Sequence, residues 1–205
     1  MTSGFLAGFL LIGLAELGDK TFFISAILSM RHSRRWVFLG AMAALTTMTL
    51  MAVLAGQIVS MLPQSIIYYG EIIVFAGFGL KLLYEAWKMT SKDVEAEVKE
   101  AEEAVNAAEA QLAQRKTPWA IMREAFGLVL VGEWGDRTQI TTVMLAATYP
   151  PVGVVAGAIS GHGISIALAV IGGRLLAGRI SERLVLAIAG TLFLMFAVAA
   201  ALRPR

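Results

Sequence analysis

Long apolar stretches separated by short polar loops dominate this chain of 205 residues. Five stretches are almost free of charge outside one repeated string, and a sixth carries Glu71, Lys81 and Glu85 toward its ends. The stretches cover roughly residues 4–30, 36–60, 65–88, 119–148, 151–173 and 184–202. Each is about 20 residues or longer, enough for a helix to cross a hydrocarbon core of about 30 Å. Because none alternates as barrel strands do, the pattern predicts an all-α membrane protein with six transmembrane helices.

The composition narrows the class of protein further. Hydrophobic residues make up 58% of the chain and charged residues 16%, whereas about a quarter of a soluble domain is charged. Cysteine is absent, which excludes a disulfide framework and a thiolate metal site. No Lys or Arg precedes the first apolar stretch, which argues against a cleaved signal or transit peptide. We therefore expect the lipid bilayer as a partner, and no nucleic acid.

The basic residues predict an orientation in the membrane. They gather in the loops after the first, third and fifth apolar stretches, and the loops at residues 61–65 and 148–151 hold none. The loop residues are Arg31, Arg34, Arg35, Lys92, Lys99, Arg115, Lys116, Arg174, Arg179 and Arg183. The positive-inside rule then places the N-terminus outside and the 89–118 linker in the cytoplasm. Only Arg203 and Arg205 disagree with this orientation.

A six-residue string occurs twice. E-L-G-D-K-T at residues 16–21 returns as E-W-G-D-R-T at residues 133–138, an offset of 117 that also maps Gly40 onto Gly157. We expect residues 1–88 to form a first three-helix repeat, 89–118 a cytoplasmic charged helical linker, and 119–205 a second three-helix repeat. Repeats with an odd number of spans insert with inverted topology, a plan of secondary transporters whose site lies near the midplane between the halves.

The strings place carboxylates inside apolar stretches, at a cost of roughly 2.5–3.5 kcal/mol per charge. The four are Glu16, Asp19, Glu133 and Asp136. Their spacing of three within each copy puts each pair on one face of a helix. Gly18 and Gly135 allow either close helix approach or a locally opened helix whose freed carbonyls join a site. Packing alone needs no carboxylates, so we expect these groups to function.

Two inverted copies that meet would gather an oxygen-rich site, to which Thr21 and Thr138 add hydroxyls. Such a set suits hard divalent cations such as Ca²⁺ and Mn²⁺. The four carboxylates carry a formal charge of −4, which Lys20 and Arg137 reduce to −2 if they face the same region. One divalent cation or two protons would neutralise that charge, so we expect electroneutral exchange of one cation for about two protons. Alternatively, each basic residue pairs only with the glutamate one turn earlier.

Three further features carry less specific signals. His162 could relay protons or help to bind metal, or it could form a hydrogen bond between helices. Apolar residues recur at helical spacing through the linker, which predicts an amphipathic helix; we expect a solvated tether, with docking on a membrane or another chain as alternatives. Its acidic residues could concentrate cations. Snorkelling would explain Glu71 and the Lys81–Glu85 pair.

The doubled Glu-x-Gly-Asp-(Lys/Arg)-(Ser/Thr) string resembles a cation/proton exchanger family, which includes the Golgi Gdt-type calcium and manganese transporters and the chloroplast manganese transporters. Residues 16–39 look most like the cyanobacterial members, described as manganese exporters that clear the cytoplasm toward the periplasm or thylakoid lumen. The resemblance implies an integral protein of the bacterial plasma membrane or the thylakoid membrane, with no cofactor beyond the transported Mn²⁺ or Ca²⁺. It implies a cation site of Glu16, Asp19, Thr21, Glu133, Asp136 and Thr138. It leaves the oligomeric state open.

Two other classes of function compete with this one. A passive divalent-cation channel could use the same carboxylates as a selectivity ring, although such rings usually come from symmetric oligomers. A membrane-embedded metalloenzyme lacks support, because the apolar stretches hold one His and no His-x-x-x-His pair. The sequence therefore favours a secondary active transporter that is not an enzyme.

Overall fold

The computed structural model describes residues 2–111, 117–176 and 181–203, and these ranges contain nine α-helices and no strand. The helices are α1 (Thr2–Ala15), α2 (Lys20–Arg31), α3 (Arg34–Val59), α4 (Gln64–Lys88), α5 (Ser91–Gln111), α6 (Pro118–Gly132), α7 (Arg137–Thr148), α8 (Pro151–Leu176) and α9 (Glu182–Ala201). The predicted all-α class is confirmed. Outside the described residues lie Arg115, Lys116, Arg179 and Arg205, on which part of the charge-based orientation rests.

Four of the described helices are long and apolar enough to cross a membrane: α3, α4, α8 and α9. The prediction of continuous helices over residues 4–30 and 119–148 is wrong. Each of these stretches breaks at its copy of the repeated string, into α1 and α2 or into α6 and α7. The alternative of a locally opened helix is the one observed.

The backbone at the breaks explains why both helices stop. Gly18 and Gly135 have φ angles of +78° and +80°, a left-handed conformation that other residues rarely adopt. Each is followed by an aspartate that caps the next helix: Asp19 accepts a hydrogen bond from the Lys20 amide, and Asp136 from the amides of Thr138 and Gln139. The Gly-Asp dipeptide therefore ends one helix and starts the next.

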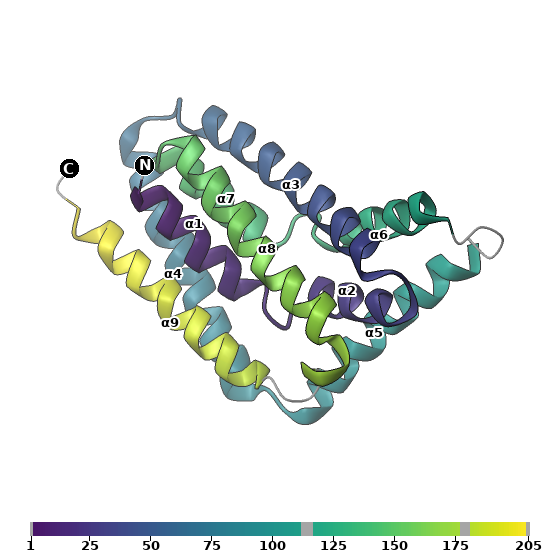
Figure 1. Cartoon of the computed structure of the whole chain (residues 1–205). Coiled ribbons are helices and arrows are strands. Elements are labelled where there is room, and N and C mark those ends of the chain that lie inside the picture. Colours follow the sequence, from purple (N-terminus) through teal and green to yellow (C-terminus); the bar gives the residue numbers. More distant parts are fainter. Residues whose placement is uncertain (1, 112–116, 177–180, 204–205) are drawn as a thin grey trace.

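In each half, the two short helices on either side of the break pack on the long helix that follows the break in the other half. Helix α1 packs on α8 as α6 packs on α3, and α2 packs on α8 as α7 packs on α3 (Figure 1). A Cβ atom at Gly40 would overlap the carbonyl oxygen of Met122, and one at Gly157 would overlap that of Phe5. Phe5 and Met122 are themselves separated by the repeat offset of 117. The same close contact is thus built twice, which supports duplicated halves.

Two hydrophobic cores flank the helix breaks, and each combines elements of both halves. Ile24 and Leu28 of α2 belong to one core, with Val129 of α6. Leu11 of α1 belongs to the other, with Leu145 of α7 and Phe193 of α9. Because each broken segment contributes one half-helix to each core, the breaks lie where the two cores meet.

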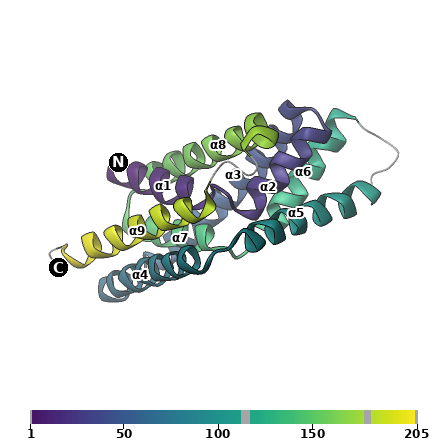
Figure 2. The ribbon, with the colours of Figure 1, turned by 90° about the horizontal axis from the view of Figure 1, so that it is seen from below.

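Helix α5 is not the solvated tether that was expected. It runs along α2 on the side of the molecule away from the start of α1 (Figures 1 and 2). Its residues Ala101 and Val105 are fully buried in the core that contains α2. Ion pairs from Lys20 to Glu100 and from Arg31 to Glu109 hold the helix at both ends of α2. The amphipathic pattern therefore describes docking on this chain itself.

The snorkelling explanation of Glu71 is also wrong. Glu71 is only 2% exposed, and its carboxylate accepts a hydrogen bond of 3.0 Å from Arg203. Arg203 donates a second hydrogen bond of 2.9 Å to the Tyr149 hydroxyl. A buried carboxylate thus neutralises the arginine that disagreed with the positive-inside orientation.

Candidate cation site at the two helix breaks

Three acidic residues from the two breaks converge at the centre of the molecule. Glu16, Glu133 and Asp136 each offer a carboxylate oxygen, and these oxygens lie within 4.8 Å of one another. Glu16 is 1% exposed and Glu133 is 3% exposed. The cluster therefore joins the end of α1 to the end of α6 and the start of α7.

Several atoms of this cluster have unsatisfied hydrogen-bonding capacity. Glu16 Oε1, Glu133 Oε2 and His162 Nδ1 are buried and have no hydrogen-bond partner. The His162 nitrogen lies 3.7 Å from Glu16 Oε1, too far for a direct hydrogen bond. Buried polar atoms are nearly always paired, so unpaired atoms on residues of one cluster and on the adjacent His162 indicate that the cluster binds a cation or protons.

The hydroxyl residues of the repeated string lie beside the carboxylates. The Thr138 hydroxyl donates a hydrogen bond of 2.8 Å to Asp136 Oδ2, which also accepts from the Thr138 amide. Thr21 is 1% exposed, and its methyl carbon would lie 3.0 Å from a Cβ atom added at Gly132, the residue before Glu133. Asp136 thus has two roles: it caps α7 and contributes an oxygen to the cluster.

Asp19 does not join the other three carboxylates. Its Oδ2 accepts a hydrogen bond of 3.2 Å from Arg137, whose guanidinium also donates to the carbonyl oxygen of Ala15 at 3.0 Å. A second guanidinium nitrogen of Arg137 lies 3.9 Å from Glu85. Three of the four carboxylates that were expected to come together therefore do so in this structure, and Asp19 does not.

The two basic residues of the string also differ from their expected places. Lys20 turns away from the cluster and pairs with Glu100 of α5. Neither Lys20 nor Arg137 pairs with the glutamate one turn earlier, because the helix break removes that turn. Both expectations for Lys20 are wrong, so the predicted net charge of −2 does not describe this cluster.

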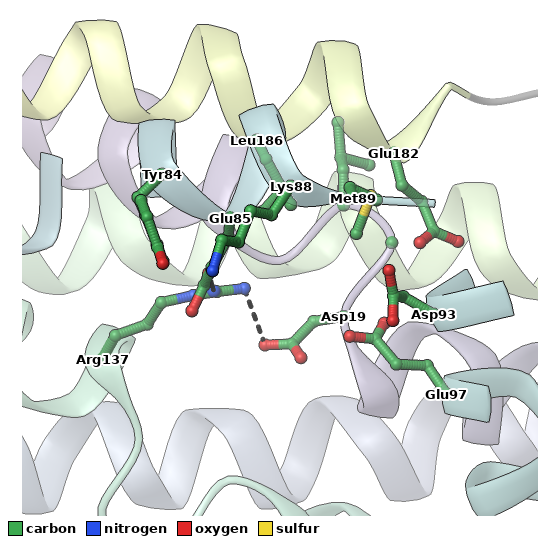
Figure 3. Close-up of a pocket in the computed structure, with 12 residues that line it drawn as sticks. Asp19, Tyr84, Glu85, Lys88, Met89, Asp93, Glu97, Arg137, Glu182 and Leu186 are labelled. Atoms are coloured by element: carbon green, nitrogen blue, oxygen red, sulfur yellow. Dashed lines mark hydrogen bonds and ion pairs between the residues drawn. The ribbon is translucent and has the colours of Figure 1, made fainter. Parts of the chain in front are cut away.

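A cavity of about 340 Å³ opens beside Asp19, on the side of the molecule that α5 covers. Figure 3 shows Asp19 between the Arg137 guanidinium and the carboxylate of Glu97. Further acidic residues line it from three helices: Glu85, Asp93 and Glu182. Burial raises the pKa of Glu97 above its usual value, and the nearby Asp19 charge raises it further. The cavity is thus an acidic vestibule, and residues of both copies of the repeated string line it, Asp19 of the first and Arg137 of the second.

Several buried polar residues outside the repeated string were missed by the sequence analysis. Thr49 is buried with an unpaired hydroxyl and shares a small cavity with Glu133, Asp136 and His162. The buried hydroxyls of Ser25 and Thr142 follow the string's threonines by four residues and are related by the same offset of 117. Extending the repeat by one helical turn would have identified this second pair. Thr49 has no such signal.

Comparison with known proteins identifies relatives over almost the whole chain. The family described as divalent cation/proton antiporter GDT1 matches residues 4–90 and 121–204, in two parts. The GDT1-like protein sll0615 of Synechocystis is 48% identical over 97% of this chain and 96% of its own length. The chloroplastic GDT1-like protein 2 of rice (Oryza sativa) is 42% identical over 96% of this chain and 60% of its own length. The chloroplastic PAM71-homolog of Arabidopsis thaliana is 41% identical over 96% of this chain and 58% of its own. No solved structure matches.

Proposed function

Because this chain belongs to the GDT1 family of divalent cation/proton antiporters, we propose that it exchanges Mn²⁺, and also Ca²⁺, for protons and exports Mn²⁺ from the cytoplasm. The protein is an integral membrane transporter and not an enzyme. One observation carries the proposal: carboxylate oxygens of Glu16, Glu133 and Asp136 converge within 4.8 Å at a buried junction of the two halves. The alternative of a passive channel does not fit an antiporter family.

The cargo ion would bind where the orphaned atoms converge. Glu16, Glu133 and Asp136 would supply the first oxygens, with Thr138 bound to Asp136 and Thr21 in the other copy of the string. Asp19 would join them only after leaving Arg137. Carboxylate and hydroxyl oxygens accept both Ca²⁺ and Mn²⁺. An imidazole from His162, 3.7 Å from Glu16, would favour Mn²⁺, because nitrogen ligands suit transition metals.

The coupling to protons would use the two buried glutamates. Arg137 already compensates the charge of Asp19, and helix-capping hydrogen bonds stabilise the charge of Asp136. Glu16 and Glu133 have no basic partner within ion-pair distance among the described residues, apart from His162. A divalent cation or two protons would neutralise these two carboxylates equally well. We therefore keep the stoichiometry of one cation for about two protons, but assign it to Glu16 and Glu133 rather than to the net charge of four carboxylates and two basic residues.

The transport path follows from the topology that we propose. The broken segments α1–α2 and α6–α7 each cross the membrane once, which gives six spans in two inverted repeats, residues 1–88 and 119–205. With the linker in the cytoplasm, the acidic vestibule beside Asp19 faces that compartment and supplies cations to the site. Broken helices at the midplane are the usual way in which transporters expose backbone groups to an ion. The protein would reside in a bacterial plasma membrane or a thylakoid membrane.

Purified protein in liposomes that contain a pH-sensitive dye tests the proposal. We expect external Mn²⁺ to drive proton release and a pH gradient to drive Mn²⁺ uphill, and both to be lost in Glu16→Gln and in Asp136→Asn. Glu103→Gln, at an exposed glutamate of α5 that pairs with Lys99 of the same helix, is the matched control. Wild-type rates in both site variants would reject the assignment. A rate that rises with imposed membrane potential would reject electroneutral exchange.

A further inference from the structure

A second group of metal-ligating side chains lies outside the transport site. His32, Glu109 and Glu124 offer one nitrogen and two carboxylate oxygens, all within 4.8 Å of one another. His32 is the C-cap of α2, Glu109 lies near the end of α5, and Glu124 lies in the second turn of α6. The group thus connects the linker helix to both halves of the protein.

The geometry of the three residues leaves one coordinating atom unused. His32 Nε2 lies 2.7 Å from Glu109 Oε1, and Arg31 donates a hydrogen bond of 2.7 Å to the other oxygen of Glu109. Glu124 is 9% exposed, and its Oε1 is buried without a hydrogen-bond partner. Nothing in the described part of the protein donates a hydrogen bond to this oxygen, and one carboxylate oxygen of Glu124 lies within 4.8 Å of ligand atoms of His32 and Glu109. A cation bound between this unpaired carboxylate oxygen and the imidazole would satisfy it.

The donor set defines the chemical class of that cation. Ca²⁺ takes six to eight oxygen ligands, and an imidazole contributes little to its binding. First-row transition cations and Zn²⁺ accept imidazole and carboxylate together, with affinities that follow the Irving–Williams order. Arg31 binds Glu109 Oε2, so a cation would take the place of the proton that lies between Glu109 Oε1 and His32 Nε2. The side chain of Glu109 is 28% exposed, which leaves an approach from solvent.

We propose that His32, Glu109 and Glu124 bind a divalent transition cation at a second site, separate from the transported ion. Occupancy joins α5 to the end of α2 and the start of α6, so it fixes the linker helix relative to both halves. Because α5 also lines the acidic vestibule through Asp93 and Glu97, the bound metal sets the position of the vestibule wall. Metal on the linker side would thus regulate access to the transport path.

Mn²⁺ binding to the full-length protein in detergent micelles tests this site, with free Mn²⁺ measured by its electron paramagnetic resonance signal. The experiment uses a Glu16→Gln/Glu133→Gln background, in which the transport site is disabled. We expect this background to retain a single bound Mn²⁺. Adding Glu124→Gln should weaken that binding by at least about tenfold, since even outer-shell changes weaken metal sites by about 10–100-fold. Zn²⁺ should displace the ion and Ca²⁺ should not.

His32→Gln provides a second variant that separates binding from folding. The glutamine amide can still donate a hydrogen bond to Glu109, so the packing of α5 is kept while the imidazole ligand is lost. Glu103→Gln is the control on the same helix, and size-exclusion elution reports the fold of every variant. The proposal is overturned if the background binds no Mn²⁺, if both variants bind it as the background does, or if Ca²⁺ displaces it as readily as Zn²⁺. Transport by the background variant would instead contradict the proposed function, without affecting this inference.

Discussion

Arg137 of the second repeated string donates a hydrogen bond of 3.2 Å to Asp19 of the first. The contact joins residues 118 positions apart, and both residues line the acidic vestibule. The guanidinium also donates to the carbonyl oxygen of Ala15, the last residue of α1. One side chain thus satisfies a freed helix carbonyl and compensates an aspartate across the interface of the two halves.

This pair gives a prediction about coupling between the halves. Removing one partner leaves the other partly buried without its ion pair across the two halves, so Arg137→Gln and Asp19→Asn should each destabilise the protein by about 1–3 kcal/mol. Their effects should not add in the double variant, because the second change removes a group that already lacks its partner. Thermal unfolding of the three variants in one detergent measures this. Additive losses would show that the contact contributes little.

The two left-handed glycines give a prediction about the helix breaks. Gly135→Ala introduces a side chain into open space, so its cost should be the conformational strain alone, about 1–2 kcal/mol. Gly18→Ala should cost more, because the new Cβ would also lie 3.1 Å from the side chain of Glu182. Gly18→Ala should therefore lower the unfolding temperature and the transport rate more than Gly135→Ala does. Equal effects would mean that the Glu182 side chain moves away from the new Cβ atom at no cost in free energy.

The duplicated close contact predicts which glycines tolerate a methyl group. Gly40→Ala and Gly157→Ala should both be destabilising by about 1–3 kcal/mol, because the methyl group would overlap a backbone carbonyl that cannot move independently. At Gly77 and Gly127, an added Cβ would have no atom within 4 Å, so these positions serve as matched controls. Their alanine variants should be neutral or more stable, by up to about 1 kcal/mol. The yield of monodisperse protein and its unfolding temperature check the contrast.

Glu97 predicts a pH effect on the linker helix. Burial, and then the Asp19 charge, raise its pKa above the value in the unfolded chain, so the folded protein binds more protons between the two values. Ionisation of Glu97 therefore lowers the free energy of unfolding as the pH rises from the unfolded pKa, about 4.3, through the raised pKa of the folded protein. Below the unfolded value Glu97 is protonated in both states and has no such effect. Glu97→Gln should stabilise the protein at about pH 8 and leave it unchanged at about pH 4. Glu95→Gln, at an exposed position on the same helix, should change neither.

The sequence by itself determined the helical class, the apolar stretches and the doubled string. A membrane admits only helices and closed barrels, the stretches do not alternate as barrel strands do, and carboxylates inside apolar stretches are rare. The sequence also determined Gly40 and Gly157 as equivalent positions. These features depend on composition and spacing, which are local properties of a chain.

Only the tertiary structure decided the partners of the charged residues. The spacing of Glu16 and Asp19 indicated one helical face, but the left-handed Gly18 separates them, so Glu16 joins Glu133 while Asp19 meets Arg137. The docking of α5, the pairing of Glu71 with Arg203 and the approach of Glu124 to His32 likewise join residues far apart in the chain. The physical reason is that long-range electrostatic pairing depends on how two folded halves interlock, and no local pattern encodes that arrangement.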